Sequence, residues 1–226
     1  MALKGQMKRL NSTRNEIVKI GQWLHQKGLV AAMDGNISAR VDDNCILSTP
    51  TCISKGMMQP EDLVLVDMHG RKLEGRREVS SEIQMHCLIY RMRPDVRGVV
   101  HAHPPTATGY ASAGLALDQA LASEIVIALG SVPLANYGTP GTPELLEALE
   151  PFVPGHQAIL MANHGAVTYA EDVLHAYMHM ETVEHYAKIS LVAHLLGNQE
   201  VLSEENIDKL RVVRQKYLAM QVVQNQ

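Results

Sequence analysis

The sequence predicts an α/β fold: a single layered domain in which a central, mainly antiparallel β-sheet is flanked by helices. The chain has 226 residues, of which 46% are hydrophobic and 19% charged, and this composition suits a folded domain with a full core. Segments of helical and strand periodicity are mixed along it without regular βαβ alternation. No internal repeat, low-complexity stretch or linker divides the chain, so we expect residues 1–226 to form one domain.

The first helix is expected to begin at Thr13. The stretch TRNE has the form of a capping box, with Glu16 three residues after the cap. An apolar stripe with helical spacing follows, and Gly28 is a natural stop. The stripe consists of Ile17, Ile20, Trp23 and Leu24.

Short apolar runs bounded by turn residues predict the strands. DGNISAR (34–40) leads from a turn into a strand, and VDDN joins it to CILSTP (45–50) as a hairpin. LVLVD (63–67) is another strand, with MHGRK as its turn. The remaining runs with strand character are RGVVHAH (97–103), EIVIALG (124–130), SVPLANY (131–137) and QAILMANHG (157–165), the last ending in a turn.

Helices are predicted between and after these strands. VSSEIQMHCLIYRMRP (79–94) reads as a helix capped by Ser80 or Ser81 and ended by Pro94. The others are a short helix in PPTATGYASAG (104–114), a capped helix in TPELLEALEPF (142–152), a long helix from Glu171 to about Leu196 and a last one from Glu204 to about Leu218.

Composition argues against several classes of partner. The net charge of −4 and the few aromatic residues do not favour binding to nucleic acid. No apolar run approaches the roughly 20 residues of a membrane span, and the N-terminus is too charged for a signal peptide. The three cysteines, Cys45, Cys52 and Cys87, fit no disulfide framework. We therefore expect a cytoplasmic protein that does not bind membranes.

A pair of histidines at 101 and 103 raises the possibility of a metal site. Side chains alternate between the faces of a strand, so His101 and His103 should point one way, and Val100 and Ala102 the other. Two neutral imidazoles on one face are part of the ligand set of a catalytic zinc site. Considered alone, such a pair in a strand is more often structural or exposed than a metal ligand.

Two further residues complete a candidate constellation. His164 follows an apolar run in LMANHG, at a strand end, and would give Zn²⁺ three histidines with a fourth position open for substrate. Glu82, in SSE at a helix start, is either a carboxylate interacting with the helix dipole or a base held near a metal. The serines before it could bind an anion at the helix N-terminus or only cap the helix.

The motifs GNIS (35–38), TPT (49–51), SSE, VVHAH and NHG each carry little specificity, but their order and spacing resemble the class II aldolase/adducin family, and within it the fuculose-phosphate aldolases. The resemblance extends from the first helix to the last. It implies zinc-dependent cleavage of a ketose 1-phosphate into dihydroxyacetone phosphate and an aldehyde. L-fuculose 1-phosphate and 5-deoxy- or 5-methylthio-pentulose 1-phosphates are the candidate substrates.

The resemblance also implies roles for individual residues. The zinc ligands would be His101, His103 and His164, and Glu82 would be the acid/base. Asn36, Thr51, Ser80 and Ser81 would bind the substrate phosphate. Tyr217, in RQKYLAM, falls where these aldolases carry a tyrosine that positions the aldehyde half. The relatives are cyclic tetramers with sites between subunits, which implies a homotetramer here.

This chain departs from the family pattern at three places. Met33 and Asp34 stand where the aldolases have threonine before GN, and Cys52 stands where they have glycine after TPT. The best match to a catalytic tyrosine after the first two histidines is Glu124. The alternatives are therefore another enzyme of the family, such as L-ribulose-5-phosphate 4-epimerase, a decarboxylase or a dehydratase, or a non-catalytic adducin-like binding module.

Overall fold

A computed structural model describes the backbone of residues 2–224 and the side chains of residues 9–216. One eight-stranded sheet forms its centre, with strand order β4-β3-β2-β1-β5-β8-β7-β6. All neighbouring strands are antiparallel except β6 and β7. The predicted α/β fold with a mainly antiparallel sheet is therefore confirmed.

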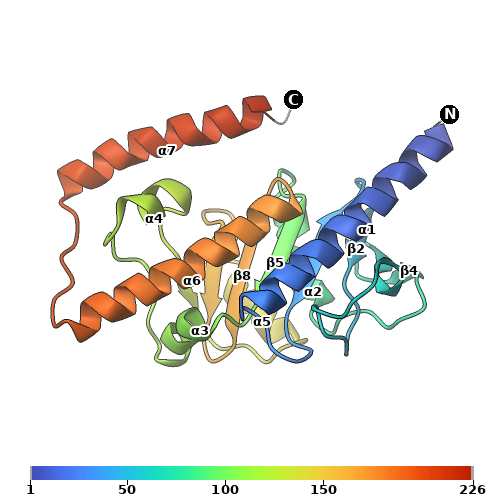
Figure 1. Ribbon diagram of the computed structural model, residues 1–226, viewed down its shortest axis with the longest axis horizontal. Coiled ribbons are helices and arrows are strands. Elements are labelled where there is room, and N and C mark those ends of the chain that lie inside the picture. Colours follow the sequence, from blue (N-terminus) through green and yellow to red (C-terminus); the bar gives the residue numbers. More distant parts are fainter. Residues whose placement is uncertain (1, 225–226) are drawn as a thin grey trace.

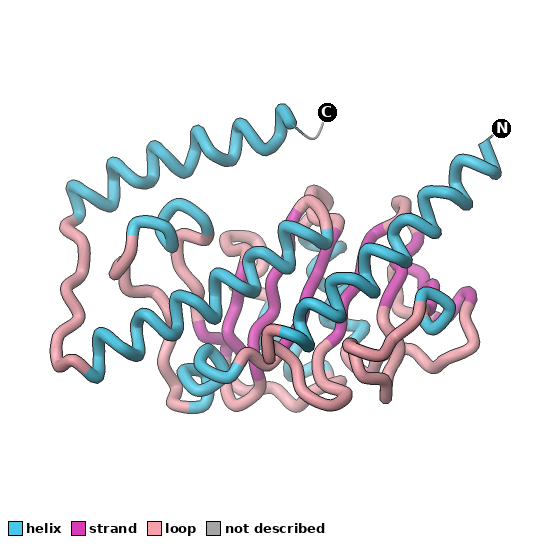
Figure 2. Tube along the Cα trace, viewed as in Figure 1, coloured by secondary structure: helices cyan, strands magenta, loops and turns pink. Residues whose placement is uncertain are grey.

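The strands are short and lie side by side (Figure 2). Their bounds are β1 Asn36–Arg40, β2 Cys45–Ser48, β3 Val64–Asp67, β4 Lys72–Glu74, β5 Gly98–Ala102, β6 Leu134–Ala135, β7 Ala158–Met161 and β8 Gly165–Ala170. The helices are α1 Ala2–Gln26, α2 Ile83–Met92, α3 Pro105–Ser112, α4 Ser123–Ala128, α5 Pro143–Leu149, α6 Val173–Leu195 and α7 Glu204–Gln224, with a 3-10 turn at Pro60–Asp62.

Helices cover both faces of the sheet, which makes three layers. Helices α1 and α6 cross one face, and α2 and α5 lie on the other (Figure 1). The strand alternation separates the two cores: Val100 and Ala102 pack on the α1/α6 side, and Val99 packs on the α2 side. His101 therefore points toward α2, and this orientation positions the candidate site.

Two predictions about the elements are wrong, and one strand was missed. Helix α1 begins at Ala2, and Thr13 lies in its interior, where its hydroxyl donates to the carbonyl of Arg9 at 3.1 Å instead of capping the helix. The EIVIALG run is helix α4, not a strand, because Ile125, Val126 and Leu129 share a buried helical face. Strand β8 was not predicted; all six of its residues are buried, so it lacks the alternation that identifies a strand.

The SSE helix also begins later than predicted. Its first helical residue is Ile83 and its N-cap is Glu82, which makes no side-chain capping bond. Ser80 and Ser81 lie in the turn before it, where the Ser80 hydroxyl accepts the backbone N–H of Glu82 at 3.3 Å. The two serines therefore precede the helix, and Glu82 lies at its N-terminal end.

Candidate active site

The structure brings the three predicted histidines together at one end of the sheet. His101 lies on β5, His103 follows the end of that strand, and His164 lies in the tight turn between β7 and β8. Since β8 pairs with β5, with Ala102 opposite Ala166, the turn is held beside the end of β5. Ligand nitrogens of the three imidazoles all lie within 4.8 Å of one another.

A hydrogen bond to the backbone orients the His101 ring for ligation. Nδ1 of His101 donates to the carbonyl of Ala166 at 2.9 Å, so Nε2 carries the free lone pair. That Nε2 lies 3.1 Å from Nε2 of His103, near the roughly 3.3 Å expected for two ligands at about 2.0–2.1 Å from a tetrahedral ion. The donor set and spacing therefore fit one divalent metal held by His101, His103 and His164.

Glu82 lies directly against this cluster. Its Oε2 is 3.3 Å from Nε2 of His101, and its Oε1 is 3.2 Å from Nε2 of His164. Within residues 9–216, the buried Oε1 has no hydrogen-bond partner. Burial disfavours the charged form of Glu82, but His101 and His164, when their rings are protonated, outweigh this cost and hold the pKa of the carboxyl well below its usual range. The site thus pairs an ionised carboxylate with three imidazoles.

His103 is the most exposed of the three imidazoles. Burial, together with the neighbouring His101 and His164, lowers the pKa of His103 to about 4. The ring is therefore neutral near pH 7 and available as a ligand. Its Nδ1 lies 3.5 Å from a carboxylate oxygen of Asp34, which can orient the ring. The sequence marks Asp34 only as a departure from the family pattern and does not predict this contact with His103.

The predicted phosphate-binding residues converge on the same end of the sheet. Pro50 and Val79 form an antiparallel bridge, and the backbone N–H of Thr51 donates to the carbonyl of Glu78 at 3.1 Å. This pairing holds Thr51 beside the turn that carries Ser80, which is buried, and Ser81, which is exposed. The loops that carry Thr51, Ser80 and Ser81 therefore lie next to the N-terminal end of helix α2.

Asn36 occupies a different place from the other three. It begins β1 directly opposite His101, and its Nδ2 donates to Oε2 of Glu82 at 2.8 Å. Its Oδ1 contacts Nε2 of His86. One Nδ2 hydrogen is left for a phosphate, because the other hydrogen bonds to Glu82 and the amide oxygen bonds to His86.

Lys55 is a buried cation that sequence reasoning missed. Its side chain is 1% exposed, and its Nζ donates to the carbonyls of Met33 at 2.9 Å and Ile53 at 2.8 Å. Burial lowers the pKa of Lys55 to about 8. The two hydrogen bonds of Lys55 connect the loop before GNIS to the loop after TPT. No residue pattern marks a lysine in a loop as buried.

Cys52 shows why its position suits glycine. Its φ is +55°, in the left-handed region that glycine adopts without steric cost. A non-glycine residue adopts this conformation with strain, so the glycine that the resemblance implies at this position would fit the backbone of this chain more easily than cysteine does.

Of the two other predicted residues, only Glu124 has a described side chain, and it is not joined to the histidines. Glu124 is exposed in the first turn of α4 and lines a groove with Lys27, Glu181 and Lys188. Across residues 9–216, no hydrogen bond or ion pair connects Glu124 with the histidine cluster. Tyr217 falls within the backbone range of α7, but its side chain lies outside the described residues.

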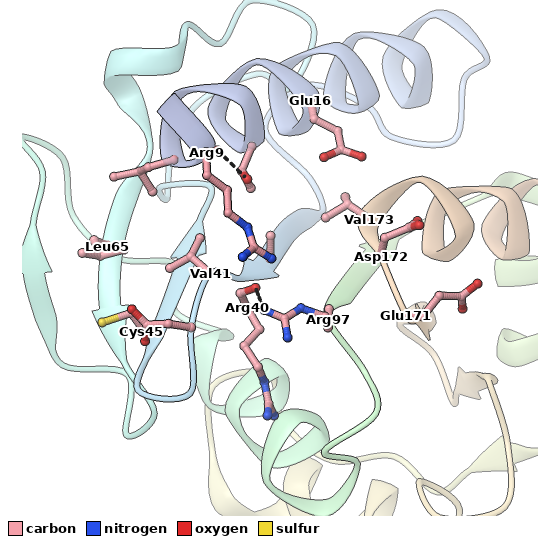
Figure 3. A pocket seen from close by; sticks show the side chains of 14 residues that line it. Arg9, Glu16, Arg40, Val41, Cys45, Leu65, Arg97, Glu171, Asp172 and Val173 are labelled. Atoms are coloured by element: carbon pink, nitrogen blue, oxygen red, sulfur yellow. Dashed lines mark hydrogen bonds between the residues drawn. The ribbon is translucent and has the colours of Figure 1, made fainter. Parts of the chain in front are cut away.

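A separate cavity of about 420 Å³ lies at the opposite end of β1 and β5 (Figure 3). Arg9, Glu16, Arg97 and Asp172 are among its lining residues, so it carries charges of both signs. Arg97 donates to the carbonyl of Arg40 at 3.5 Å within it. It contains none of the predicted site residues and is not the catalytic candidate.

Comparison with known proteins identifies the family of this chain. Residues 15–191 match the family model described as the class II aldolase and adducin N-terminal domain. A 5-deoxy-D-ribulose 1-phosphate aldolase of Bacillus thuringiensis is 33% identical over 202 residues, covering 89% of this chain and 94% of that protein. A 3-oxo-tetronate 4-phosphate decarboxylase of Pectobacterium atrosepticum is 32% identical, covering 87% and 91%.

The fold comparison gives the same result. A solved structure of L-fuculose 1-phosphate aldolase superposes with a TM-score of 0.83 at 31% identity, covering 88% of this chain and 94% of that one. Among residues 2–224, no helix has the length and apolar character needed to span a membrane. From its sequence match and its fold, the chain belongs to the class II aldolase and adducin family.

Proposed function

We propose that this protein is a metal-dependent aldolase that cleaves a ketose 1-phosphate into dihydroxyacetone phosphate and an aldehyde. The observation that carries the proposal is the position of Glu82, whose two carboxylate oxygens lie 3.3 and 3.2 Å from His101 and His164. A base in contact with a three-histidine cluster, beside hydroxyl-bearing loops, suits proton transfer on a phosphorylated ketone. The similarity to 5-deoxy-D-ribulose 1-phosphate and L-fuculose 1-phosphate aldolases supports this substrate class.

The cleavage requires one proton to move. The bond between C3 and C4 of the ketose breaks, the C4 hydroxyl loses its proton to become the aldehyde carbonyl, and C3 gains a proton. Glu82 is the proposed shuttle, since its carboxylate lies against the histidine cluster and can accept a proton before returning one. Asn36 holds one oxygen of this carboxylate at 2.8 Å and thereby fixes its orientation.

The proposed cofactor is one Zn²⁺ per subunit, held by His101, His103 and His164. Three neutral imidazoles with an open fourth position are typical of catalytic zinc, although other divalent ions accept the same ligands. When bound, the ion supplies a Lewis acid that stabilises negative charge on the substrate's carbonyl oxygen. No lysine Schiff base is required.

The substrate phosphate is proposed to bind among Thr51, Ser80, Ser81 and the remaining Nδ2 hydrogen of Asn36. Hydroxyl groups and the N-terminal end of helix α2 supply donors and a partial positive charge. The ammonium of Lys55, which donates to the carbonyl of Ile53 in the loop after Thr51, adds positive charge to this part of the protein.

The rest of the proposal concerns assembly and location. We propose a homotetramer in which Tyr217 of one subunit completes the site of the next, in the cytoplasm. Cys45, Cys52 and Cys87 are free thiols, as expected in a reducing compartment. An adducin-like binding module without catalysis is disfavoured because the chain retains all three histidines and Glu82.

A second candidate reaction is decarboxylation of a 3-oxo acid phosphate. The 32% identity to a 3-oxo-tetronate 4-phosphate decarboxylase over 87% of the chain favours it. Loss of CO2 from such an acid also leaves dihydroxyacetone phosphate. The coproduct, an aldehyde or CO2, therefore separates the two reactions.

The experiment is a substrate panel assayed with metal-loaded protein. It contains L-fuculose 1-phosphate, 5-deoxyribulose 1-phosphate, 5-methylthioribulose 1-phosphate, L-ribulose 5-phosphate, 3-oxo-tetronate 4-phosphate and the unphosphorylated ketoses. We expect the highest kcat/KM, with aldehyde release, for a ketose 1-phosphate. CO2 release as the faster reaction would establish the decarboxylase instead, and equal turnover of unphosphorylated ketoses would contradict the phosphate site.

A further inference from the structure

A continuous chain of hydrogen bonds joins the core of the protein to Glu82. The Tyr90 hydroxyl lies 2.9 Å from the Ser38 hydroxyl, which lies 2.6 Å from Nδ1 of His86. Nε2 of His86 contacts Oδ1 of Asn36, whose Nδ2 donates to Glu82 at 2.8 Å. Ser38, His86, Tyr90 and Asn36 are all buried, each at most 4% exposed. We call Tyr90, Ser38, His86 and Asn36 the Tyr90 chain.

Two elements build this chain by their regular periods. Glu82, His86 and Tyr90 are four residues apart, so they share one face of helix α2. Asn36 and Ser38 are two residues apart on β1, and both point toward α2, because Ile37 and Ala39 pack on the other side of the sheet. Side chains from helix and strand alternate along the chain.

The direction of every bond is fixed by chemistry. An ionised carboxylate only accepts, so Asn36 presents its amide nitrogen to Glu82 and its oxygen to His86. His86 therefore donates from Nε2 and, as a neutral ring, accepts at Nδ1 from the Ser38 hydroxyl. The Ser38 oxygen then accepts from the Tyr90 hydroxyl. All donors point toward Glu82.

Burial keeps His86 and Tyr90 in the protonation states that these hydrogen bonds require. It lowers the pKa of His86 to about 3, so the ring stays neutral across the working range of pH. Burial also raises the pKa of Tyr90 far above its usual value, so the phenol keeps its proton. The guanidinium of Arg40 lies 5.1 Å above the Tyr90 ring at the far end of the chain.

We propose that Tyr90, Ser38 and His86 are positioning residues for the reaction: they lock the Asn36 amide in the one orientation that donates to Glu82. The inference rests on the proposed role of Glu82 as proton shuttle. If the Asn36 amide turned over, its oxygen would face the carboxylate, and two acceptors would repel one another. The chain makes that orientation costly because His86 would then have no acceptor for its Nε2–H.

Two substitutions at one position separate positioning from general stability. In His86→Gln the amide nitrogen reaches the place of Nε2 and can still donate to Asn36. In His86→Asn the shorter side chain reaches only the place of Nδ1, so this donor is lost. We expect kcat to fall about 10- to 100-fold in His86→Asn, with KM and metal content little changed, and to recover largely in His86→Gln.

The imidazole of His86 provides a readout that does not depend on activity. In 15N-histidine-labelled protein, assigned by the signal missing from His86→Gln, Nδ1 should be unprotonated and Nε2 protonated from pH 5.5 to 8.5. A protonated Nδ1, or equal kcat values for His86→Asn, His86→Gln and the wild type, would overturn the inference. Absence of aldolase and decarboxylase activity in the metal-loaded wild type would instead overturn the proposed function.

Discussion

The carboxylate of Glu82 lies at the centre of the candidate site. It meets His101, His164 and Asn36, and it stands at the N-cap of α2. Replacing it with glutamine retains its shape and removes its ability to take up a proton. We expect kcat of Glu82→Gln to fall about 10²- to 10⁴-fold, with a smaller change in KM.

Exchange of the C–H protons of dihydroxyacetone phosphate with deuterated solvent measures the proton step alone. The exposed Glu74, on the edge strand β4, provides the matched control, and Glu74→Gln should exchange at the wild-type rate. A near-normal exchange rate in Glu82→Gln would exclude this residue as the shuttle.

Metal binding is tested at His103. Removing its imidazole leaves two ligands, so His103→Ala should lose the metal and the activity together. Elemental analysis of the wild type should find one divalent ion per chain. His69→Ala, which removes an exposed imidazole from a surface turn, should keep the full metal content. Full occupancy in His103→Ala would show that the ion is held elsewhere.

The buried charge of Lys55 predicts a dependence of stability on pH. Its pKa is lowered from 10.5 to about 8, so between these values the unfolded chain binds a proton that the folded chain has released. The contribution of Lys55 to the free energy of unfolding is therefore lowest below pH 8. It rises as the pH approaches 10.5, by at most about 1.4 kcal/mol per pH unit. The free energy of unfolding of the wild type, minus that of Lys55→Met, should increase over this window.

Urea unfolding at pH 7.5, 8.5 and 10 measures this difference. Lys216→Met, at an exposed position on α7, should give a difference that is flat over the same range. A flat difference for Lys55→Met as well would mean that Lys55 retains an ordinary pKa in the folded protein.

At the scale of elements, the site depends on how closely β8 approaches the end of β5. A Cβ on Gly165 would lie 2.6 Å from the carbonyl of Ala102 and 2.6 Å from the ring of His103. Either the strand pair or the imidazole must shift. We expect Gly165→Ala to fold with lowered metal affinity, measured by competition with a chelator. Gly109→Ala, where a Cβ meets nothing within 4 Å, should bind metal like the wild type.

At the scale of the whole molecule, α7 packs on α4 at the edge of the fold (Figure 1). The proposed homotetramer predicts that Tyr217 acts on a neighbouring subunit. Mixing inactive His103→Ala chains with impaired Tyr217→Phe chains should then raise activity above the sum of the parents. Some interfaces would combine an intact metal site with an intact tyrosine.

Size-exclusion chromatography with light scattering gives the oligomeric state, and exchange of tagged subunits confirms that mixing has occurred. If exchange is complete and Tyr217→Phe is clearly impaired, the absence of any gain would place Tyr217 in its own subunit's site. A monomer in solution would contradict the shared site directly.

The sequence by itself determined the broad fold and the family, and it named the candidate site residues. The HxH spacing on a strand placed His101 and His103 near one another, and the order of GNIS, TPT, SSE, VVHAH and NHG indicated the family. Local signals were weaker for boundaries. The TRNE stretch lies in the middle of α1, and the EIVIALG run is helical, because tertiary packing outweighs a short local pattern.

Only the tertiary structure decided which elements are neighbours. Periodicity fixes the side chains that share a face, but it says nothing about which face meets which. The pairing of β5 with β8 brought His164 to His101, and the packing of α2 on β1 joined Asn36 to Glu82 and His86. Burial of Lys55 follows from two loops closing over it. These contacts join residues far apart in the chain, and such contacts form only when the whole sheet and its helices assemble.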